Sequence, residues 1–338
     1  MRWLLTVVLL SVISGTLCAQ NTSNTGSTLH TGTRLVVVPV LVQSATKEVV
    51  YSLHADDFLL TDKGVPQKVS LDEANKQPLS LVVLMQTGSA AVREFDKYRG
   101  LETMLASILG GTPNQVAIVN FDSKPEAASP FTSDIAQWTD AIDHPDPGDS
   151  GAAIMDALKF GLDLLAKQPA NHRRVILLIS QPQDSGSKTT AKEIARITGE
   201  TNTAIYSITF TPQITRLKGA IKEGGHPHPP VTVGNGSYVA YFELTEPLQL
   251  MKDAIRKDVA AEAATLSGGE AIRFENRQQL ADVVASIGNH IRYRYMLTFT
   301  PSPADLGFHP IRVSLIHYPE LTVSARSSYW LTDSENSK

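Results

Sequence analysis

Long apolar runs alternate with amphipathic stretches through the middle of the chain. A strand covered on both faces needs no polar positions, so these runs predict buried strands at 79–85, 115–121, 174–180 and 204–210. Between the runs, apolar residues recur every three or four positions, which predicts helices near 92–109, 134–143, 153–167 and 187–199. Strands and helices in this alternation predict an α/β fold with a doubly wound, mostly parallel sheet.

The same alternation resumes after an irregular stretch. Residues 211–240 contain Gly and Pro clusters without a regular period, and they predict a loop insertion. A helix near 246–265, a short strand at 271–274 and a helix that begins after Asn276 follow it. The predicted α/β domain therefore spans 79–294.

Both ends of the chain carry short apolar runs separated by turn residues. The predicted strands are 35–42, 49–53, 58–61 and 67–71 near the start, and 295–300, 311–316 and 321–329 near the end. A small isolated sheet is only marginally stable. We therefore expect the N-terminal segment 34–78 and the C-terminal segment 295–332 to pack together as one small β-sandwich.

Residues 1–19 have the layout of a secretory signal peptide. Arg2 precedes the apolar run 4–13, and small and polar residues follow as far as Ala19. Because this run is too short to span a membrane, we expect cleavage after Ala19 and export to the periplasm or the extracellular space. Residues 20–33 are polar and predict a flexible leader. No later apolar stretch reaches the length of a transmembrane segment.

Cys18 is the only cysteine of the chain and lies within the predicted signal peptide. We therefore expect a cysteine-free mature chain, with no disulfides and no thiol chemistry. Acylation of Cys18 would instead give a lipoprotein, but Leu17 is bulky where a small residue is required.

Composition limits the remaining classes. The chain has 338 residues, of which 42% are hydrophobic and 19% are charged, so it can bury a core and is not globally disordered. Its formal net charge is −4. Nucleic acids and anionic membranes require a clustered positive surface, and nothing in this balance favours either as a partner.

Three blocks of sequence carry a resemblance to a known family. The first lies within 53–69, the second is the α/β body from Leu81 onward, and the third lies within 295–329. The body resembles a von Willebrand factor A domain. The order of the blocks is similar to that of the Acidobacterial-type secreted proteins called VWFA-related.

This resemblance implies a metal-ion-dependent adhesion site at the carboxyl edge of the sheet. Family members supply oxygen ligands from three loops: Asp-x-Ser-x-Ser after the first strand, Thr before a helix, and Asp after a central strand. The residues at the matching positions here are Gln86, Gly88, Ala90, Ala152 and Gln181. A turn shorter by one residue would bring Ser89 to the second Ser position.

These differences remove both carboxylates and the Thr hydroxyl. Mg²⁺ takes about six oxygen ligands and gives up its water reluctantly. The loss of two charges near a dication costs several kcal/mol even at an effective dielectric constant of about 20. We therefore expect a degenerate, metal-free site without a cofactor, in which Gln86 and Gln181 hydrogen-bond to each other or to loop backbone.

A second interpretation uses substitute ligands. Asp122, Asp149 and Asp184 fall on the same predicted edge and could hold Ca²⁺ in a different geometry. Loop aspartates also form turns and caps without an ion. His226 and His228 would supply only half of a metal site, because such a site needs three or four ligands.

Few features point to catalysis. Ser89, within TGSAA, lacks the Gly-x-Ser-x-Gly elbow of many hydrolases, and no His occupies an obvious partner position. A hydrolase would need a Ser–His pair within hydrogen-bond reach. The Gly-containing stretches 111–115 and 267–270 lack the Lys of a phosphate-binding loop.

The sequence thus favours an exported, non-enzymatic interaction module with a protein partner. We expect its contact surface at 86–90, 149–153 and 181–187, together with the 211–240 insertion. The alternative is a divalent-cation-dependent adhesion protein that uses the substitute aspartates.

Overall fold

A computed structural model of the chain describes residues 35–72, 77–109, 113–210, 258–302 and 305–331. The expected signal peptide, leader and 211–240 insertion lie outside these residues, and so do His226 and His228. Only the end of the helix predicted at 246–265 is described. Within the described ranges, no helix is both long enough and apolar enough to cross a membrane.

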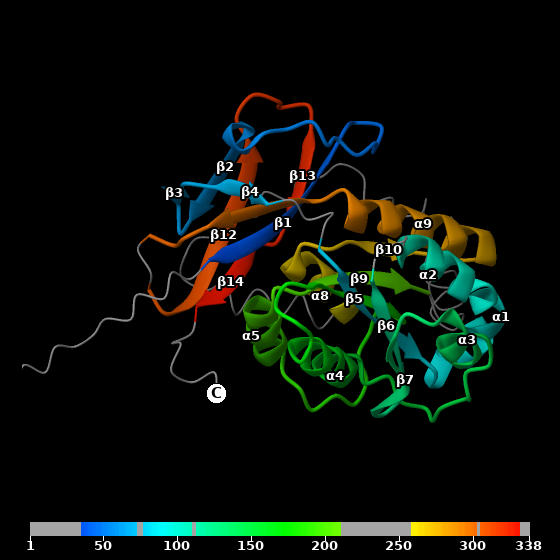
Figure 1. The fold of residues 1–338 in the computed structure, drawn as a ribbon. Coiled ribbons are helices and arrows are strands. Elements are labelled where there is room, and N and C mark those ends of the chain that lie inside the picture. Colours follow the sequence, from blue (N-terminus) through cyan, green and yellow to red (C-terminus); the bar gives the residue numbers. More distant parts are fainter. Residues whose placement is uncertain (1–34, 73–76, 110–112, 211–257, 303–304, 332–338) are drawn as a thin grey trace, which may run out of the picture. The chain divides into compact units, whose positions relative to one another are not determined.

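A six-stranded sheet forms the centre of the α/β body (Figure 1). In spatial order its strands are β10 (Ala271–Arg273), β9 (Ala204–Thr209), β8 (Arg173–Ser180), β5 (Leu79–Gln86), β6 (Gln115–Phe121) and β7 (Pro125–Thr132). All neighbouring strands are parallel except β6 and β7. The predicted, mostly parallel sheet is confirmed, and the end of β5 lies in the middle of its carboxyl edge.

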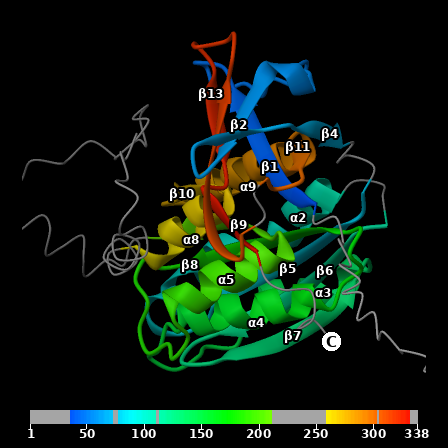
Figure 2. The ribbon, with the colours of Figure 1, turned by 90° about the vertical axis from the view of Figure 1, so that its left-hand side faces the viewer.

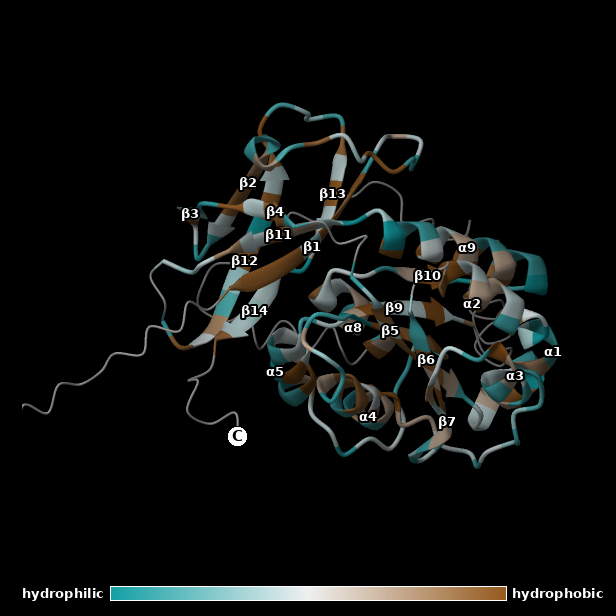
Figure 3. Ribbon diagram, viewed as in Figure 1, coloured by the Kyte–Doolittle hydropathy of each residue, from teal (hydrophilic) through white to brown (hydrophobic). Residues whose placement is uncertain are grey.

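Helices cover both faces of this sheet (Figures 1 and 2). The first face packs against α1 (Phe95–Tyr98), α2 (Leu101–Leu109), α3 (Ile135–Asp143) and α9 (Arg277–Arg292). The second packs against α4 (Ile154–Ala166), α5 (Ala191–Thr201) and α8 (Val259–Ser267). Side chains alternate along a strand, so Leu81 and Val83 enter the first core while Val82 and Leu84 enter the second. Figure 3 shows these apolar strands between helices that also carry polar residues.

Local sequence explains most helix boundaries. The side chains of Thr190 and Asn276 accept backbone N–H bonds at the starts of α5 and α9. The continuous helix predicted over 92–109 is wrong. Gly100, with a φ of 83°, separates α1 from α2, and the 3-10 helix η3 (Ser89–Glu94) precedes α1. The apolar period continues through this break, because both helices bury the same side against the sheet.

Two four-stranded antiparallel sheets form the β-sandwich from both ends of the chain. The first has the order β13 (Thr322–Ala325), β1 (Val36–Gln43), β11 (Tyr295–Phe299) and β4 (Ser70–Asp72). The second has the order β14 (Ser328–Leu331), β12 (Gly307–Leu315), β2 (Phe58–Asp62) and β3 (Val65–Gln67). Their inner faces share one apolar core, which includes Val38, Leu60 and Leu297. The predicted sandwich is confirmed.

Four details of the strand prediction are wrong. Residues 49–53 form only an isolated bridge at Val49. The run 67–71 divides into the end of β3 and the start of β4, and the run 321–329 divides at Arg326, in each case into strands of two different sheets. The edge strand β7 was not predicted. It pairs on one side only and is largely exposed, so its sequence PEAASPFT lacks the apolar run of a buried strand.

The last strand brings the sandwich into contact with the α/β body. Arg326, between β13 and β14, is buried and donates a 3.0 Å hydrogen bond to Oδ1 of Asn202, which follows α5. A Cβ atom on Gly199 of α5 would lie 2.9 Å from the backbone nitrogen of Trp330. The helix and the strand therefore approach each other too closely for any larger residue at that position.

Candidate functional site

Four loops meet at the carboxyl edge of the central sheet. Three of them follow β5, β6 and β8, and the fourth leads from α3 into α4. The first loop is hydrogen-bonded to its neighbours through backbone atoms: Thr87 N–H donates to Phe121 O at 2.8 Å, and Ser89 N–H donates to Asp149 O at 2.8 Å. The sequence predicted this edge from the ends of the parallel strands.

Gln86 lies at the centre of the edge and is fully buried. Its Oε1 accepts the backbone N–H of Gln181 at 2.8 Å, and its Nε2 donates to Gly88 O at 3.0 Å and to Gln181 Oε1 at 3.3 Å. The Nε2 of Gln181 in turn donates to Gln183 O at 2.9 Å. The two amides therefore bond to each other and to loop backbone, and both use their oxygens as acceptors within the protein.

Gly88 lies where two other loops, those that follow β6 and α3, leave no room for a side chain. A Cβ atom there would be 2.6 Å from Asp149 O, 2.6 Å from Gly151 O and 2.7 Å from Asp122 Cβ. Gly151 is equally confined, since its Cβ would lie 2.6 Å from the backbone of Ser123. The loops pack directly against one another at the position where the family's first Ser would stand.

The other family positions hold small residues. Ala152 is fully buried and exchanges two backbone hydrogen bonds, of 3.3 and 2.8 Å, with Ser185. Ala90 is partly buried against the core of the first sheet face. Ser89 is exposed, with a φ of 55° that is uncommon for a residue other than glycine.

Asp122 and Asp149 each bond to the backbone of the loops. Asp149 accepts from Ser123 N–H at 3.1 Å, Ser123 Oγ at 2.5 Å and Gly151 N–H at 2.7 Å. Asp122 accepts from the N–H groups of Lys124 and Asp149, both at 3.1 Å. The hydrogen bond from the Ser123 hydroxyl, followed by that from Gly151 N–H, lowers the pKa of Asp149.

Asp184 caps a helix to which it does not belong. Its Oδ1 accepts the backbone N–H of Met155, in the first turn of α4, at 3.0 Å and also the Ser187 hydroxyl at 2.5 Å. The same hydroxyl accepts from the N–H of Asp156 at 3.1 Å. Residues of the loop after β8 thereby satisfy amides at the start of α4, where a helix has no intrahelical partners for them.

Asp156, in the first turn of α4, makes the reciprocal contact to the loop after β8. The sequence analysis did not identify this residue. Its carboxylate accepts the N–H groups of Lys188 and Thr189, the closer of them at 2.8 Å. Burial raises the pKa of Asp156, but hydrogen bonds from Thr189 and Lys188 outweigh burial and lower it overall. An acidic residue in the first turn of a predicted helix was the available signal, although it does not identify the remote partner.

The residues at this edge do not fit a divalent cation of the family's kind. Amides and methyl groups replace the carboxylates and the hydroxyl, and the amide oxygens already accept protein hydrogen bonds. Asp122, Asp149 and Asp184 each bond to loop or helix amides. Across the part of the chain that the structure describes, no group of three or more His, Cys, Asp or Glu side chains is arranged to hold a metal ion.

Two Ser–His pairs occur among the described residues, although neither contains Ser89. Ser80 Oγ lies 2.9 Å from His172 Nδ1, and Ser286 Oγ lies 3.4 Å from His290 Nε2. Ser80 is fully buried at the start of β5, at the opposite end of the strand from the candidate edge. A hydroxyl without solvent access cannot attack a substrate, so this pair gives no support to hydrolysis.

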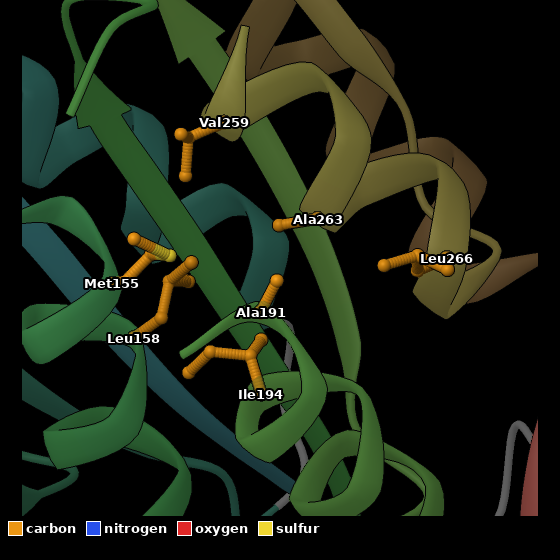
Figure 4. Close-up of a pocket in the computed structure, with 7 residues that line it drawn as sticks. All are labelled: Met155, Leu158, Ala191, Ile194, Val259, Ala263 and Leu266. Carbon is orange, nitrogen blue, oxygen red and sulfur yellow. The ribbon is translucent and has the colours of Figure 1, made fainter. Parts of the chain in front are cut away.

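A small apolar pocket lies beside the edge, between α4, α5 and α8 (Figure 4). Its lining residues are Met155, Leu158, Ala191, Ile194, Val259, Ala263 and Leu266. These side chains offer no hydrogen bond to a ligand. The pocket is a gap in the packing of three helices and lacks the polar groups of a recognition site.

Comparison with known sequences identifies part of the chain. The family model described as von Willebrand factor type A domain matches residues 76–184. This range runs from just before β5 into the loop after β8, so it includes the other three loops of the candidate edge and the first part of this one. No curated protein gives a match.

Solved structures with a similar fold include BatB from Bacteroides thetaiotaomicron, with 14% identity, a TM-score of 0.43, and coverage of 63% of this chain and 98% of that one. An aerotolerance-related membrane protein from Bacteroides fragilis has 14% identity, a TM-score of 0.40, and coverage of 62% and 98%. Proximal thread matrix protein 1 from the mussel byssus has 10% identity, a TM-score of 0.43, and coverage of 64% and 48%. At these TM-scores the structures add nothing to the family match.

Proposed function

We propose that the von Willebrand factor type A domain of this chain is a non-enzymatic interaction module that binds a protein partner at its carboxyl edge without a metal ion. The observation that carries the proposal is the hydrogen-bonded pair Gln86 and Gln181 at the centre of that edge. A partner that docks there is held by shape and by hydrogen bonds to the exposed loop residues.

The packing of the loops supports a preformed, metal-independent surface. Backbone hydrogen bonds join the first loop to the second and fourth, and the close contacts at Gly88 and Gly151 fix their separation. In a domain with an ion, that ion holds the loops together. Here direct loop-to-loop contacts do so, and the surface needs no cofactor to be ordered.

Export is the second part of the proposal and rests on the signal peptide expected at residues 1–19. The mature protein then works in the periplasm or outside the cell. A chain without cysteine in its mature part holds its fold there through its apolar cores rather than through disulfides.

The first experiment is a thermal melt of the chain from residue 20, in EDTA and then with millimolar Mg²⁺, Ca²⁺ or Mn²⁺. An ion that binds only the folded state must raise its stability by mass action. We expect the same melting temperature in all four conditions. An increase with one ion that disappears in Asp122→Ala, Asp149→Ala or Asp184→Ala would establish the alternative, a cation-dependent adhesion protein.

The second experiment locates the partner surface. Ser150 and Ser185 are exposed residues of two edge loops, and Ala285 is exposed on α9. Chains carrying Ser150→Arg with Ser185→Arg, and a control with Ala285→Arg, are used to capture proteins from the exported fraction of the source cells in EDTA. We expect a partner that binds the wild type and the control and is lost from the double variant. The wild-type capture is repeated without EDTA. A partner that binds the wild type without EDTA but not in EDTA would contradict the proposal.

A further inference from the structure

A buried polar cluster joins three strands of the sandwich, far from the candidate edge. Asp62 ends β2, His309 lies in β12 and Tyr329 lies in β14. Their exposed fractions are 4%, 1% and 3%. We call these three residues the His309 clasp. Polar groups so deeply buried must satisfy one another, because no solvent reaches them.

The contacts within the clasp are short. His309 Nδ1 lies 3.0 Å from each carboxylate oxygen of Asp62, and Tyr329 Oη donates to Asp62 Oδ2 at 2.6 Å. The rings of His309 and Tyr329 stack, with centroids 4.7 Å apart. The other ring nitrogen, Nε2, lies 2.6 Å from the backbone oxygen of Asp305.

These contacts limit where the imidazole carries its protons. A carbonyl oxygen only accepts, so His309 Nε2 must carry a proton to bond to Asp305. Tyr329 already gives its own proton to Asp62, and burial, followed by the hydrogen bond to Asp62, raises the pKa of Tyr329 so that the phenol stays protonated. The Asp62 carboxyl faces His309 Nδ1 with both oxygens, and Tyr329 Oη lies 3.1 Å from the same nitrogen. If Asp62 is ionised, its contact with Nδ1 is favourable only when Nδ1 donates; a protonated Asp62 would instead donate to an unprotonated Nδ1.

We propose that His309 is a buried imidazolium paired with the Asp62 carboxylate, and that loss of its proton as the pH rises loosens the sandwich. With one proton gone, a lone pair of the ring would point at an oxygen across about 3 Å, and a buried acceptor pair of this kind is unfavourable. The clasp would thus make the attachment of β2 to β12 and β14 depend on pH.

Other charged groups near the clasp do not replace this proton. Lys63, next to Asp62, forms a 3.4 Å ion pair with the side chain of Asp305, and both of those side chains are substantially exposed. Arg326 interacts electrostatically with Tyr329 and donates hydrogen bonds to Ser328 O and Asn202 Oδ1. The first sheet contributes Phe299, an apolar ring 5.7 Å from that of Tyr329. None of these contacts supplies a donor to Asp62 in place of His309.

Nuclear magnetic resonance of the ¹⁵N-labelled full chain tests the protonation state directly. We expect both ring nitrogens of His309 to show shifts of protonated nitrogen from about pH 6 to about pH 8, where a free imidazole loses its proton. His144, which directly follows α3 and is exposed, serves as the internal reference for an imidazole in contact with solvent. An unprotonated His309 Nδ1 throughout this range would overturn the proposal.

Urea unfolding at about pH 6 and about pH 9 tests the consequence. We expect the midpoint of the wild type to fall between the two pH values. The midpoint of Asp62→Asn should be lower at about pH 6 and should change less, because the variant lacks the carboxylate that holds the proton. Asp56→Asn, an exposed control beside β2, should behave as the wild type does. Equal pH dependence in Asp62→Asn and the wild type would contradict the role of the clasp, and the resonance experiment stands even if that variant does not fold.

Discussion

The candidate edge and the His309 clasp both join distant segments through buried polar side chains, but with opposite chemistry. Gln86 and Gln181 are neutral amides that bond to each other and to backbone. Asp62 contacts His309 within the sandwich at 3.0 Å, and the two form an ion pair when the imidazole is protonated. Neutral amides lose less hydration free energy on burial than charges do, and they do not titrate. The edge should therefore keep its shape across a range of pH in which the sandwich changes its stability.

The largest effect is expected when the ion pair is broken on one side. Asp62→Ala leaves a buried imidazolium without its carboxylate, which should cost about 3–5 kcal/mol of unfolding free energy. Urea unfolding measures this loss. Asp56→Ala, on the exposed surface, should cost less than about 0.5 kcal/mol. A similar loss for both variants would show that the clasp contributes no more than a surface residue does.

The second effect tests the packing of the edge. Gly88→Ser places a Cβ atom at 2.6 Å from Asp149 O, so loops must move, and we expect a loss of about 1–3 kcal/mol. The change restores a family ligand without creating room for it. Gly186→Ser is a control in the loop after β8, where nothing lies within 4 Å of a Cβ atom, although its φ of 97° adds some strain. If Gly88→Ser were more stable than Gly186→Ser, the loops around residue 88 would leave room for a side chain, contrary to the prediction.

The third prediction concerns a charge introduced into the buried pair of amides, Gln86 and Gln181. Gln86→Glu keeps the shape of the side chain but replaces its donor nitrogen with a carboxylate oxygen. That oxygen would face Gly88 O and Gln181 Oε1, which are also acceptors. We expect a loss of about 1–3 kcal/mol at neutral pH, part of it recovered in acid when the carboxyl is protonated. Gln183→Glu, on the exposed part of the same edge, serves as control. Stabilisation of Gln86→Glu by Ca²⁺ or Mg²⁺ would show that one carboxylate suffices to restore ion binding.

The smallest effect concerns a carboxylate on α3. Burial, then the proximity of Glu102, raises the pKa of Asp143. The folded state therefore binds a proton more tightly than the unfolded state does, and stability increases as the pH falls through the interval between the ordinary and the raised pKa. Above that interval the ionised group destabilises the fold, so Asp143→Asn should raise stability at neutral pH, by less than about 1 kcal/mol. Thermal melts of both chains from acid to neutral pH measure this difference, which should vanish in acid. If Asp143→Asn were less stable than the wild type at neutral pH, the ionised carboxylate would stabilise the fold, which contradicts the prediction.

The candidate edge was predictable because its residues follow strands in order. Apolar runs predicted β5, β6 and β8, and the ends of parallel strands meet at one edge, so Gln86 and Gln181 were expected together. The resemblance to a von Willebrand factor A domain is confirmed for residues 76–184. The loss of the metal remains a prediction for the ion-binding measurements. The hydrogen bond from the start of α4 to Asp184, a residue of another loop, was not predictable, because a loop aspartate has many possible partners.

The order of hydrophobic and polar residues was enough to predict the mostly parallel sheet, its helical layers and a sandwich made from both ends of the chain. These features follow from periods of two and three to four residues, which are local and visible in the sequence. The His309 clasp was invisible at that level, because its members are separated by as many as 267 residues. Likewise, the close contacts around Gly88 depend on how three loops converge in space. Such contacts arise from long-range packing, and the free energy of a polar group depends on which neighbours that packing brings within hydrogen-bond reach.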